Sequence, residues 1–296
     1  MDVKQPLLSL DLRVDYPNKP GTLKHTCLEI HPGEILGLVG ESGSGKSTLA
    51  LAIMRLLDLK GGTTAGKIRF RGYDLMTASE SDMRHLRGRD MALVLQSPLD
   101  SLNPALRIGT QLAECWRAHA RGTRIEVLAA VSGALTRVGL PADEGFRSRY
   151  PSQISVGQAQ RVLIAMAVMH SPALLIADEP TTALDVITQL EILRLIADLN
   201  RSMGTAVLYI SHDLQSVAAI CHRIAVLYHG EIVECGTREQ MLTTPAHPYS
   251  RLLLACVPRL QQATSSQPCA TEEHVLHFPA TAPRLRSGNS GRTELR

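Results

Sequence analysis

A run of eight residues, Gly40-Glu41-Ser42-Gly43-Ser44-Gly45-Lys46-Ser47, has the composition of a loop that binds phosphate. Glycines let backbone N–H groups approach phosphate oxygens without a Cβ in the way. Lys46 adds a positive charge for the β- and γ-phosphates, and the Ser47 hydroxyl can bind Mg²⁺. An apolar stretch, 35–39, precedes the run and a predicted helix, 47–59, follows it, which is the context that such a loop requires. The sequence therefore predicts a nucleotide site, whose candidate contacts are Gly40, Glu41, Ser42, Gly43, Ser44, Gly45, Lys46, Ser47 and Thr48.

Two carboxylates end a second apolar stretch, 174–177. Asp178 is the candidate that holds Mg²⁺, directly or through a water molecule. Glu179 comes next, where the chain leaves the predicted strand, and can orient or polarise a water that attacks a phosphate. An apolar strand that ends in Asp-Glu is common, so this pattern gains its meaning from the phosphate loop upstream. Together the two motifs predict hydrolysis of the bound nucleotide, with Glu179 as a catalytic residue.

Gln96 and His212 each follow an apolar stretch, 93–95 and 207–210 respectively. In a parallel sheet such strand ends gather at one edge, beside the nucleotide. The amide of Gln96 can reach the metal or the water, and His212 can donate a hydrogen bond to a γ-phosphate oxygen as charge develops there. The predicted catalytic residues are Glu179, His212, Gln96 and Lys46, and the predicted Mg²⁺ ligands are Ser47, Gln96 and Asp178.

The elements that position these residues alternate between strands and helices. Strands are expected at 35–39, 91–95, 174–177, 205–210 and 224–227, and helices at 156–169, 186–203 and 214–221. This alternation predicts an α/β fold with a mostly parallel sheet that helices cover on both faces. Residues 8–35 read instead as short strands broken by turns, and apolar residues recur at helical spacing between 108 and 139. We therefore expect a helical insertion at about 97–155.

The composition is that of an ordinary globular protein, with 44% hydrophobic residues, 20% charged residues and a formal net charge of +3. This balance, with only 3% aromatic residues, argues against a large surface for nucleic acid. No stretch approaches the roughly 20 apolar residues that cross a bilayer, so any link to a membrane is expected through a partner. Residues 259–296 are rich in Ser, Thr, Pro, Gly and Arg, and we expect a tail without a fixed core there.

The ordered motifs resemble the nucleotide-binding subunits of ABC transporters over roughly residues 8–258. Ser155-Val156-Gly157-Gln158 matches the signature motif of that family, Thr182-Ala183-Leu184-Asp185 its D-loop, and Ser211-His212-Asp213 its switch region. The resemblance implies a P-loop NTPase (RecA-like) core, an N-terminal antiparallel β subdomain and an inserted α-helical subdomain, with residues 1–258 as the ATPase domain. ATP and Mg²⁺ are the implied cofactors.

In that family two such domains face head to tail, and each ATP lies between the phosphate loop of one and the signature motif of the other. The resemblance thus implies that Ser155, Gly157 and Gln158 act on nucleotide held by a partner ATPase subunit. It gives Asp185 a role in coupling across the dimer. Tyr16 is a candidate for the aromatic residue that stacks on adenine, although a Tyr before Pro17 is equally compatible with a strand end.

Further segments resemble the ATPases of oligopeptide, dipeptide and nickel importers, especially His247-Pro248-Tyr249-Ser250. Many peptide-importer members carry a cysteine-rich stretch near the C-terminus, associated with an iron–sulfur cluster. Here only Cys269 follows Cys256, so we expect no such cluster. The signature also departs from the family pattern, because Val156 replaces a glycine. A β-branched side chain there could restrict the backbone beside Gly157 and weaken one of two ATP sites in a heterodimer.

The resemblance implies a bacterial importer ATPase for peptides or a related small solute, on the cytoplasmic face of the inner membrane. Its implied partners are a second ATPase subunit, identical or different, two permease subunits and an extracytoplasmic solute-binding protein. Alternatives remain: a nickel or metallophore importer ATPase, a non-transport ATPase of the same superfamily in DNA repair or translation, or a regulatory subunit without turnover. Steady-state ATPase activity of the wild type against Glu179→Gln separates the last of these from the first.

Overall fold

The computed structural model describes residues 5–182 and 184–256. The described residues all belong to one compact unit. The expected tail, 259–296, and the expectation about Cys269 and an iron–sulfur cluster lie outside the described residues.

The first sheet is antiparallel and has the strand order β2-β1-β4-β5. Its strands are β1 (Leu8–Tyr16), β2 (Lys19–Ile30), β4 (Thr63–Phe70) and β5 (Tyr73–Asp74). Alternate residues of β1, among them Leu8, Leu10 and Leu12, are buried, whereas Asp11 and Arg13 between them are exposed. This period of two shows that one face packs on the core and the other meets solvent.

The second sheet has the order β10-β9-β3-β8-β7-β6. Its strands are β3 (Ile35–Val39), β6 (Met91–Val94), β7 (Leu174–Asp178), β8 (Ala206–Ser211), β9 (Arg223–Tyr228) and β10 (Glu231–Thr237). All neighbours pair in parallel except β9 and β10, which are antiparallel. Every residue of β3 and β7 is buried, as expected for strands that are covered on both faces. The predicted α/β fold with a mostly parallel sheet is confirmed.

Alternate residues of β3 face two separate hydrophobic cores. Leu36 and Leu38 belong to the core between this sheet and the N-terminal sheet, which also takes in Leu49 from α1 (Lys46–Ile53). Ile35 and Val39 belong to the core on the opposite face, which includes Ile196 from α8 (Val186–Met203). Complete burial of one such side chain stabilises the fold by about 1.5–3 kcal/mol. The strand that leads into the phosphate loop is therefore fixed from both sides.

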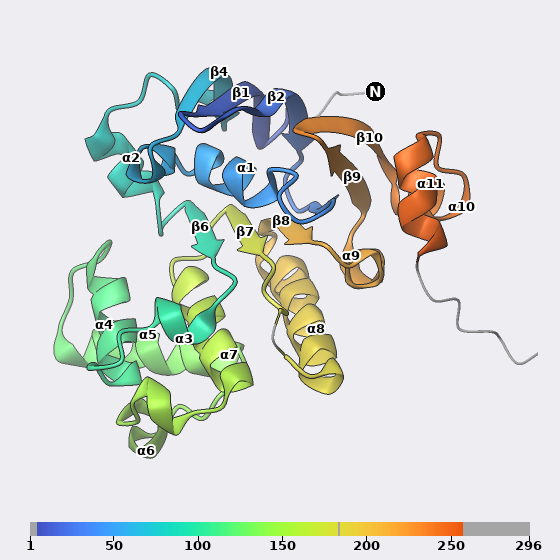
Figure 1. The fold of residues 1–296 in the computed structure, drawn as a ribbon. Helices are drawn as coiled ribbons and strands as arrows, with labels where there is room; N and C mark the ends of the chain where they lie inside the picture. Colours follow the sequence, from blue (N-terminus) through green and yellow to red (C-terminus); the bar gives the residue numbers. More distant parts are fainter. Residues whose placement is uncertain (1–4, 183, 257–296) are drawn as a thin grey trace, which may run out of the picture. The chain divides into compact units, whose positions relative to one another are not determined.

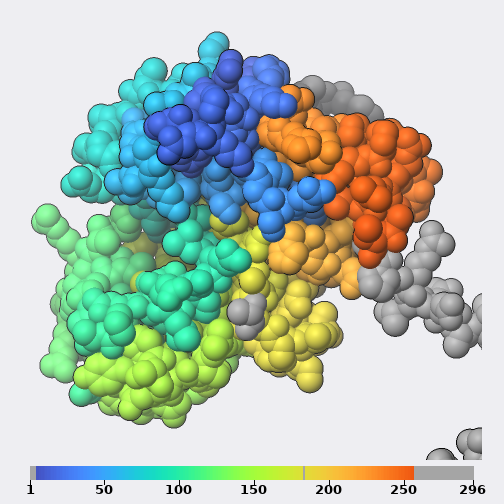
Figure 2. Space-filling view, viewed as in Figure 1, coloured from blue at the N-terminus to red at the C-terminus, as the bar shows by residue number. Residues whose placement is uncertain are grey.

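Helices that gather beside the sheet in Figure 1 occupy the segment between β6 and β7. They are α3 (Pro98–Ser101), α4 (Ile108–Arg117), α5 (Arg124–Arg137), α6 (Glu144–Arg147) and α7 (Val156–Ala167), with a 3₁₀ turn at Pro151–Gln153. Their buried side chains, such as Leu112, Val131 and Phe146, join the core that α8 lines. Figure 2 shows this green segment as a distinct mass next to the yellow surface of α8. Among these described helices, none has the length and apolar character that crossing a membrane requires.

The remaining helices differ in part from expectation. The predicted helix 47–59 ends early, because α1 stops at Ile53 and a 3₁₀ turn (Leu57–Lys60) follows. Arg55, between them, has a φ of 49°, which is outside the α-helical region, and its backbone N–H donates to Ala52 at 3.0 Å. Its guanidinium group donates to the carbonyl of Leu75 at 2.8 Å. Helix α9 (Leu214–Ile220) was expected. Three elements were not predicted from the sequence: α2 (Glu80–Leu86), β10 and α10 (Arg238–Thr243). The last described helix is α11 (Pro248–Ala255).

Candidate active site

The phosphate loop joins the end of β3 to the first turn of α1. Glycine is required at Gly40, because a Cβ there would lie 2.2 Å from the carbonyl oxygen of Leu227. Gly43 and Gly45 have φ angles of 81° and 111°, in the left-handed region that glycine enters without strain. The loop is thus pressed against β9 and turned toward the start of α1, where the helix presents its positive end.

The ammonium group of Lys46 lies inside this loop. Its Nζ donates to the carbonyl oxygens of Gly40 and Glu41, both at 2.9 Å, and the side chain is 5% exposed. Burial lowers the pKa of Lys46, while the neighbouring carboxylates of Glu179 and Asp178 oppose that shift. Glu179 Oε1 lies 4.0 Å from Nζ. Lys46 therefore stands between the loop and the carboxylates, where a bound phosphate would meet it.

Asp178 ends β7 and is buried beside the loop. Burial raises the pKa of this carboxyl, and a hydrogen bond from Ser47 opposes the shift. Its Oδ1 atom has no hydrogen-bond partner among the described residues. A buried carboxylate oxygen without a partner, next to a hydroxyl, fits the hard oxygen ligands that Mg²⁺ prefers. The described residues are therefore compatible with the predicted metal site.

Three side chains contact the same carboxylate oxygen of Glu179. Its Oε2 accepts from Gln96 Nε2 at 3.1 Å and from Thr182 Oγ1 at 3.0 Å, and lies 3.2 Å from His212 Nδ1. The residue has a φ of 47°, which is uncommon for a side chain with a Cβ and turns the chain sharply out of the sheet. The structure therefore brings together Glu179, Gln96, His212 and Lys46. Thr182 was assigned to the D-loop, but its contact with Glu179 was not predicted, although its position three residues after Glu179 was a possible signal.

A pocket of about 550 Å³ lies over these groups. It is lined by Tyr16, Lys19, Thr22, Ser42, Gly43, Gly45, Lys46, Ser47, Thr48, Lys60, Gln96 and Glu179. The Tyr16 ring packs on Gly62, where an added Cβ would lie 2.8 Å from the ring. Tyr16 is itself one of the lining residues, and its contact with adenine stays a prediction. Lys19, Thr22 and Lys60 were not predicted, because basic residues and threonines without a motif are common on surfaces.

The signature residues are not among those that line this pocket. Ser155 is the N-cap of α7, where its hydroxyl accepts from the backbone N–H of Gln158 at 3.2 Å and its own N–H donates to the Gln158 side chain at 3.1 Å. An added Cβ at Gly157 would lie 2.6 Å from Cγ2 of Thr188 in α8. The predicted contacts therefore fall into two places, the phosphate pocket and the joined starts of α7 and α8.

Asp185 occupies the equivalent N-cap position of α8. Its Oδ1 accepts from the backbone N–H groups of Ile187 at 3.1 Å and Thr188 at 3.0 Å, and its Oδ2 accepts from the Thr188 hydroxyl at 2.7 Å. Val156 is the first residue of α7 and is half-buried. Its φ is not positive, so its β-branched side chain does not force the backbone out of the helix start.

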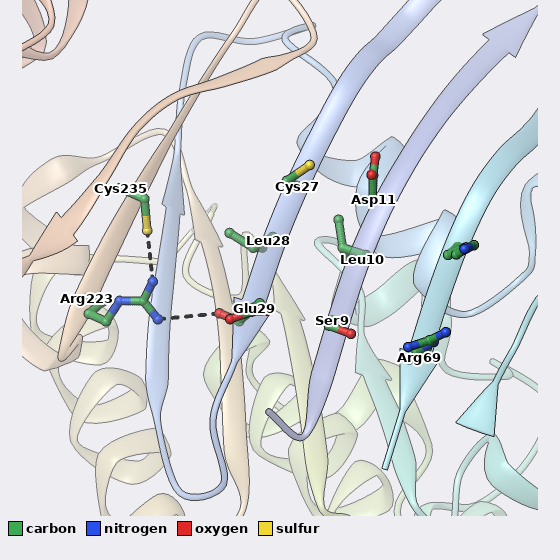
Figure 3. A pocket seen from close by; sticks show the side chains of 10 residues that line it. Ser9, Leu10, Asp11, Cys27, Leu28, Glu29, Arg69, Arg223 and Cys235 are labelled. Atoms are coloured by element: carbon green, nitrogen blue, oxygen red, sulfur yellow. Dashed lines mark hydrogen bonds between the residues drawn. The ribbon is translucent and has the colours of Figure 1, made fainter. Parts of the chain in front are cut away.

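A separate hollow lies between the outer face of the N-terminal sheet and β9–β10, and Figure 3 shows its lining. Arg223 donates to the Sγ of Cys235 at 3.3 Å and to the carbonyl oxygen of Glu29 at 3.4 Å, and it pairs with Glu34 at 3.0 Å. These contacts tie the two sheets together. None of the predicted phosphate or metal contacts lines this hollow, so we assign the chemistry to the phosphate pocket.

The site has three parts: a glycine loop at the end of β3, a buried lysine inside that loop, and a pair of carboxylates at the end of β7, which β8 separates from β3. Together they define a P-loop nucleotide-binding ATPase. A family model described as ABC transporter matches residues 23–182. A second, described as Oligopeptide/dipeptide transporter, C-terminal region, matches residues 233–277. The chain belongs to the ABC transporter family, and its resemblance to the oligopeptide/dipeptide branch is confirmed.

Curated relatives include the glutathione import ATP-binding protein GsiA of Shigella dysenteriae, which is 47% identical over 248 residues. The protein of that name from Escherichia coli is 46% identical over 248 residues. Each alignment covers 82% of this chain and 40% of the relative, so the chain spans less than half the length of these relatives.

Two similar solved structures are of the ATP-binding cassette MJ0796. One is described as a dimeric post-hydrolysis state bound to ADP and Pi; it has a TM-score of 0.67, 26% identity and coverage of 78% of this chain and 98% of that chain. The other, described as the dimeric structure of this bacterial ABC transporter cassette, has a TM-score of 0.67, 27% identity and the same coverage. These likenesses confirm the predicted ATPase cassette fold.

Proposed function

We propose that this chain is the ATP-binding and ATP-hydrolysing subunit of a bacterial ABC importer that takes up peptides or a related small solute. The observation that carries the proposal is the position of Glu179. Its carboxylate lies 4.0 Å from the phosphate-loop lysine, contacts Gln96, Thr182 and His212, and lines the same pocket as the phosphate loop. A base in this place can take a proton from, or orient, a water that attacks the γ-phosphate.

Each residue of the site has a distinct task in this proposal. Phosphoryl transfer needs mainly positioning and stabilisation of charge. Lys46 and the N–H groups of the loop bind the phosphate oxygens, Glu179 orients the water, and His212 donates to the developing charge. Ser47, Asp178 and Gln96 would hold Mg²⁺, which when bound neutralises phosphate charge. Tyr16 supports the adenine ring.

The location of the signature residues away from the pocket supports action as half of a dimer. Ser155, Gly157, Gln158 and Asp185 would then contact nucleotide held by a second ATPase subunit, identical or different. We place the assembly at the cytoplasmic face of the inner membrane, with two permease subunits and a solute-binding protein. The names of the relatives favour glutathione or another small peptide as the solute, and nickel remains the alternative within the branch.

Uptake by the host cell tests this proposal. The chromosomal gene is replaced by the Glu179→Gln variant, and accumulation of labelled glutathione, a dipeptide, an oligopeptide and Ni²⁺ is compared with the wild type. Glu114→Gln, an exposed glutamate on α4, is the matched control. We expect uptake of one solute to fall at least about tenfold in Glu179→Gln alone, because loss of a general base costs 10²–10⁴-fold in rate. Unchanged uptake of all four solutes contradicts the proposal.

A further inference from the structure

The segment His247-Pro248-Tyr249, which marks the subfamily in the sequence, makes a direct contact with the phosphate loop. The backbone N–H of Glu41 donates to the phenol oxygen of Tyr249 at 3.1 Å, across 208 positions of sequence. Figure 2 shows the blue surface near the loop in contact with the orange-red surface of the C-terminal helices. Tyr249 is not among the residues that line the phosphate pocket, so its contact with the loop lies outside that pocket.

Every residue of the segment helps to place this phenol. His247 is the N-cap of α11, and its Nδ1 accepts from the backbone N–H of Tyr249 at 3.2 Å. Pro248 opens the helix, where its missing N–H costs no hydrogen bond. The Glu234 carboxylate of β10 accepts from the N–H groups of Ala246 at 2.7 Å and His247 at 2.9 Å. The start of α11 is therefore fixed to the sheet.

The ring of Tyr249 is fixed as well. It stacks on the ring of Tyr228 at the end of β9, with centroids 4.0 Å apart and an interplanar angle of 25°. Tyr249 is 6% exposed. Because burial and the nearby Glu41 raise the pKa of the phenol, it stays uncharged at neutral pH and accepts the loop N–H as a neutral group.

The peptide groups of Glu41 are held from two sides as a result. The N–H bonds to Tyr249, while the carbonyl oxygen accepts from Lys46 Nζ at 2.9 Å. We propose that Tyr249 is a positioning residue for nucleotide binding, which holds the first turn of the phosphate loop, and with it Lys46, in the shape that receives phosphate. The C-terminal segment is then part of the nucleotide site and shares in its free energy of binding. This inference rests on the proposed function of the site.

Tyr249→Phe tests the inference, because it keeps the ring stack and removes only the hydroxyl. ATP affinity of the full chain is measured by titration, together with KM and kcat for hydrolysis. We expect the Kd and KM for ATP to rise about three- to tenfold, as for the loss of one hydrogen bond, with kcat within about twofold of wild type. Tyr228→Phe, which also loses a hydroxyl from the stack, is the control; this hydroxyl has no hydrogen-bond partner among the described residues, and we expect no change in KM.

The outcomes separate this inference from the function on which it rests. If the wild type binds no ATP, the proposed function is overturned and the inference falls with it. If the wild type binds ATP and Tyr249→Phe has the same Kd and KM, or loses kcat at constant KM, the inference alone is overturned. Hydrogen exchange adds a second readout: ATP should slow exchange of the α11 amides in the wild type and less so in Tyr249→Phe. Equal slowing in both proteins contradicts the coupling.

Discussion

Oε2 of Glu179 lies 3.2 Å from Nδ1 of His212, although 33 positions separate the two residues in the sequence. The contact exists because β7 and β8 pair in parallel, with Asp178 opposite Ile210, so that the residues after both strands emerge at the same edge. Gln96 comes to the same oxygen from the end of β6. Polar residues that follow three neighbouring strands thus meet at one carboxylate. Their contacts fix the orientation of the Glu179 side chain toward the phosphate loop.

Replacement of the loop lysine should mainly reduce nucleotide affinity. Lys46→Ala removes a buried cation that would bond to phosphate, and charge-assisted bonds contribute about 1.5–3 kcal/mol each. We expect the Kd for ATP to rise about 10- to 100-fold in an equilibrium titration. Lys60→Ala is the control, because Lys60 lines the same pocket but is exposed and should change the Kd less than about threefold. Equal effects of the two variants would argue against a specific role for Lys46.

Replacement of the buried Asp178 should affect the stability of the unliganded chain and its stabilisation by Mg²⁺ and ATP in opposite directions. Burial raises the pKa of Asp178, so the ionised form present at neutral pH is disfavoured in the folded chain. Asp178→Asn removes that cost, and we expect the Tm without ligand to hold or rise by about 2–4 °C. The increase in Tm on adding Mg²⁺ and ATP should shrink, and EDTA should have the same effect on the wild type. A variant that is stabilised by Mg²⁺ and ATP as strongly as the wild type would contradict the metal assignment.

The contact between α7 and α8 predicts a compensating pair of substitutions. Gly157→Ala places a Cβ 2.6 Å from Cγ2 of Thr188, and such overpacking costs about 1–3 kcal/mol. We expect it to lower the free energy of unfolding. Thr188→Ser keeps the hydroxyl that bonds to Asp185 and removes the methyl group, so the double variant should regain most of this loss.

A glycine without neighbours provides the control for this pair. Gly133 lies within α5, and an added Cβ there would have no heavy atom within 4 Å. Gly133→Ala should therefore stabilise the chain by about 1 kcal/mol without any change in hydrolysis. The α7–α8 contact does not act as described if Thr188→Ser fails to restore the stability of Gly157→Ala, as judged by urea unfolding.

The helical segment should lose stability in mild acid because of a histidine pair. The rings of His119 and His170 lie 5.2 Å apart, and burial, then His170, Arg89 and His85, lower the pKa of His119. A lowered pKa means that the unfolded chain binds protons first. Stability is therefore full above the ordinary histidine pKa of about 6.5 and is lost as the pH falls below it. His119→Gln should flatten the fall in Tm between pH 7 and 5, and an unchanged slope would refute this assignment.

The local patterns of the core were sufficient to predict its main elements. The fully apolar stretches became β3, β6, β7, β8 and β9, and the helix 186–203 was predicted to the residue. Strand β10 was missed because its residues are mostly half-buried at a sheet edge and show no clean alternation. Helix α2 is short and charged, yet Ser79 and Asp82 form a capping box that the sequence already contains.

The sequence predicted those site residues that belong to a motif. It did not predict contacts between segments that are distant along the chain. The loop, Asp178, Glu179, Gln96 and His212 follow from strand ends and residue types. The contact of Tyr249 with Glu41 joins opposite ends of the chain, and no local pattern encodes it. The bond from the Arg55 side chain to the carbonyl of Leu75 is of the same kind, since it is tertiary.

Hydrolysis of ATP by the full-length chain, purified with the subunits that stay bound to it, tests the central role of Glu179 most directly. In Glu179→Gln we expect the rate of phosphate release at saturating ATP to fall by about 10²–10⁴-fold, because the general base is lost, while the Kd for ATP stays within about threefold. Glu114→Gln should behave as the wild type in both measurements. A Glu179→Gln variant that releases phosphate within about twofold of the wild-type rate would contradict the account.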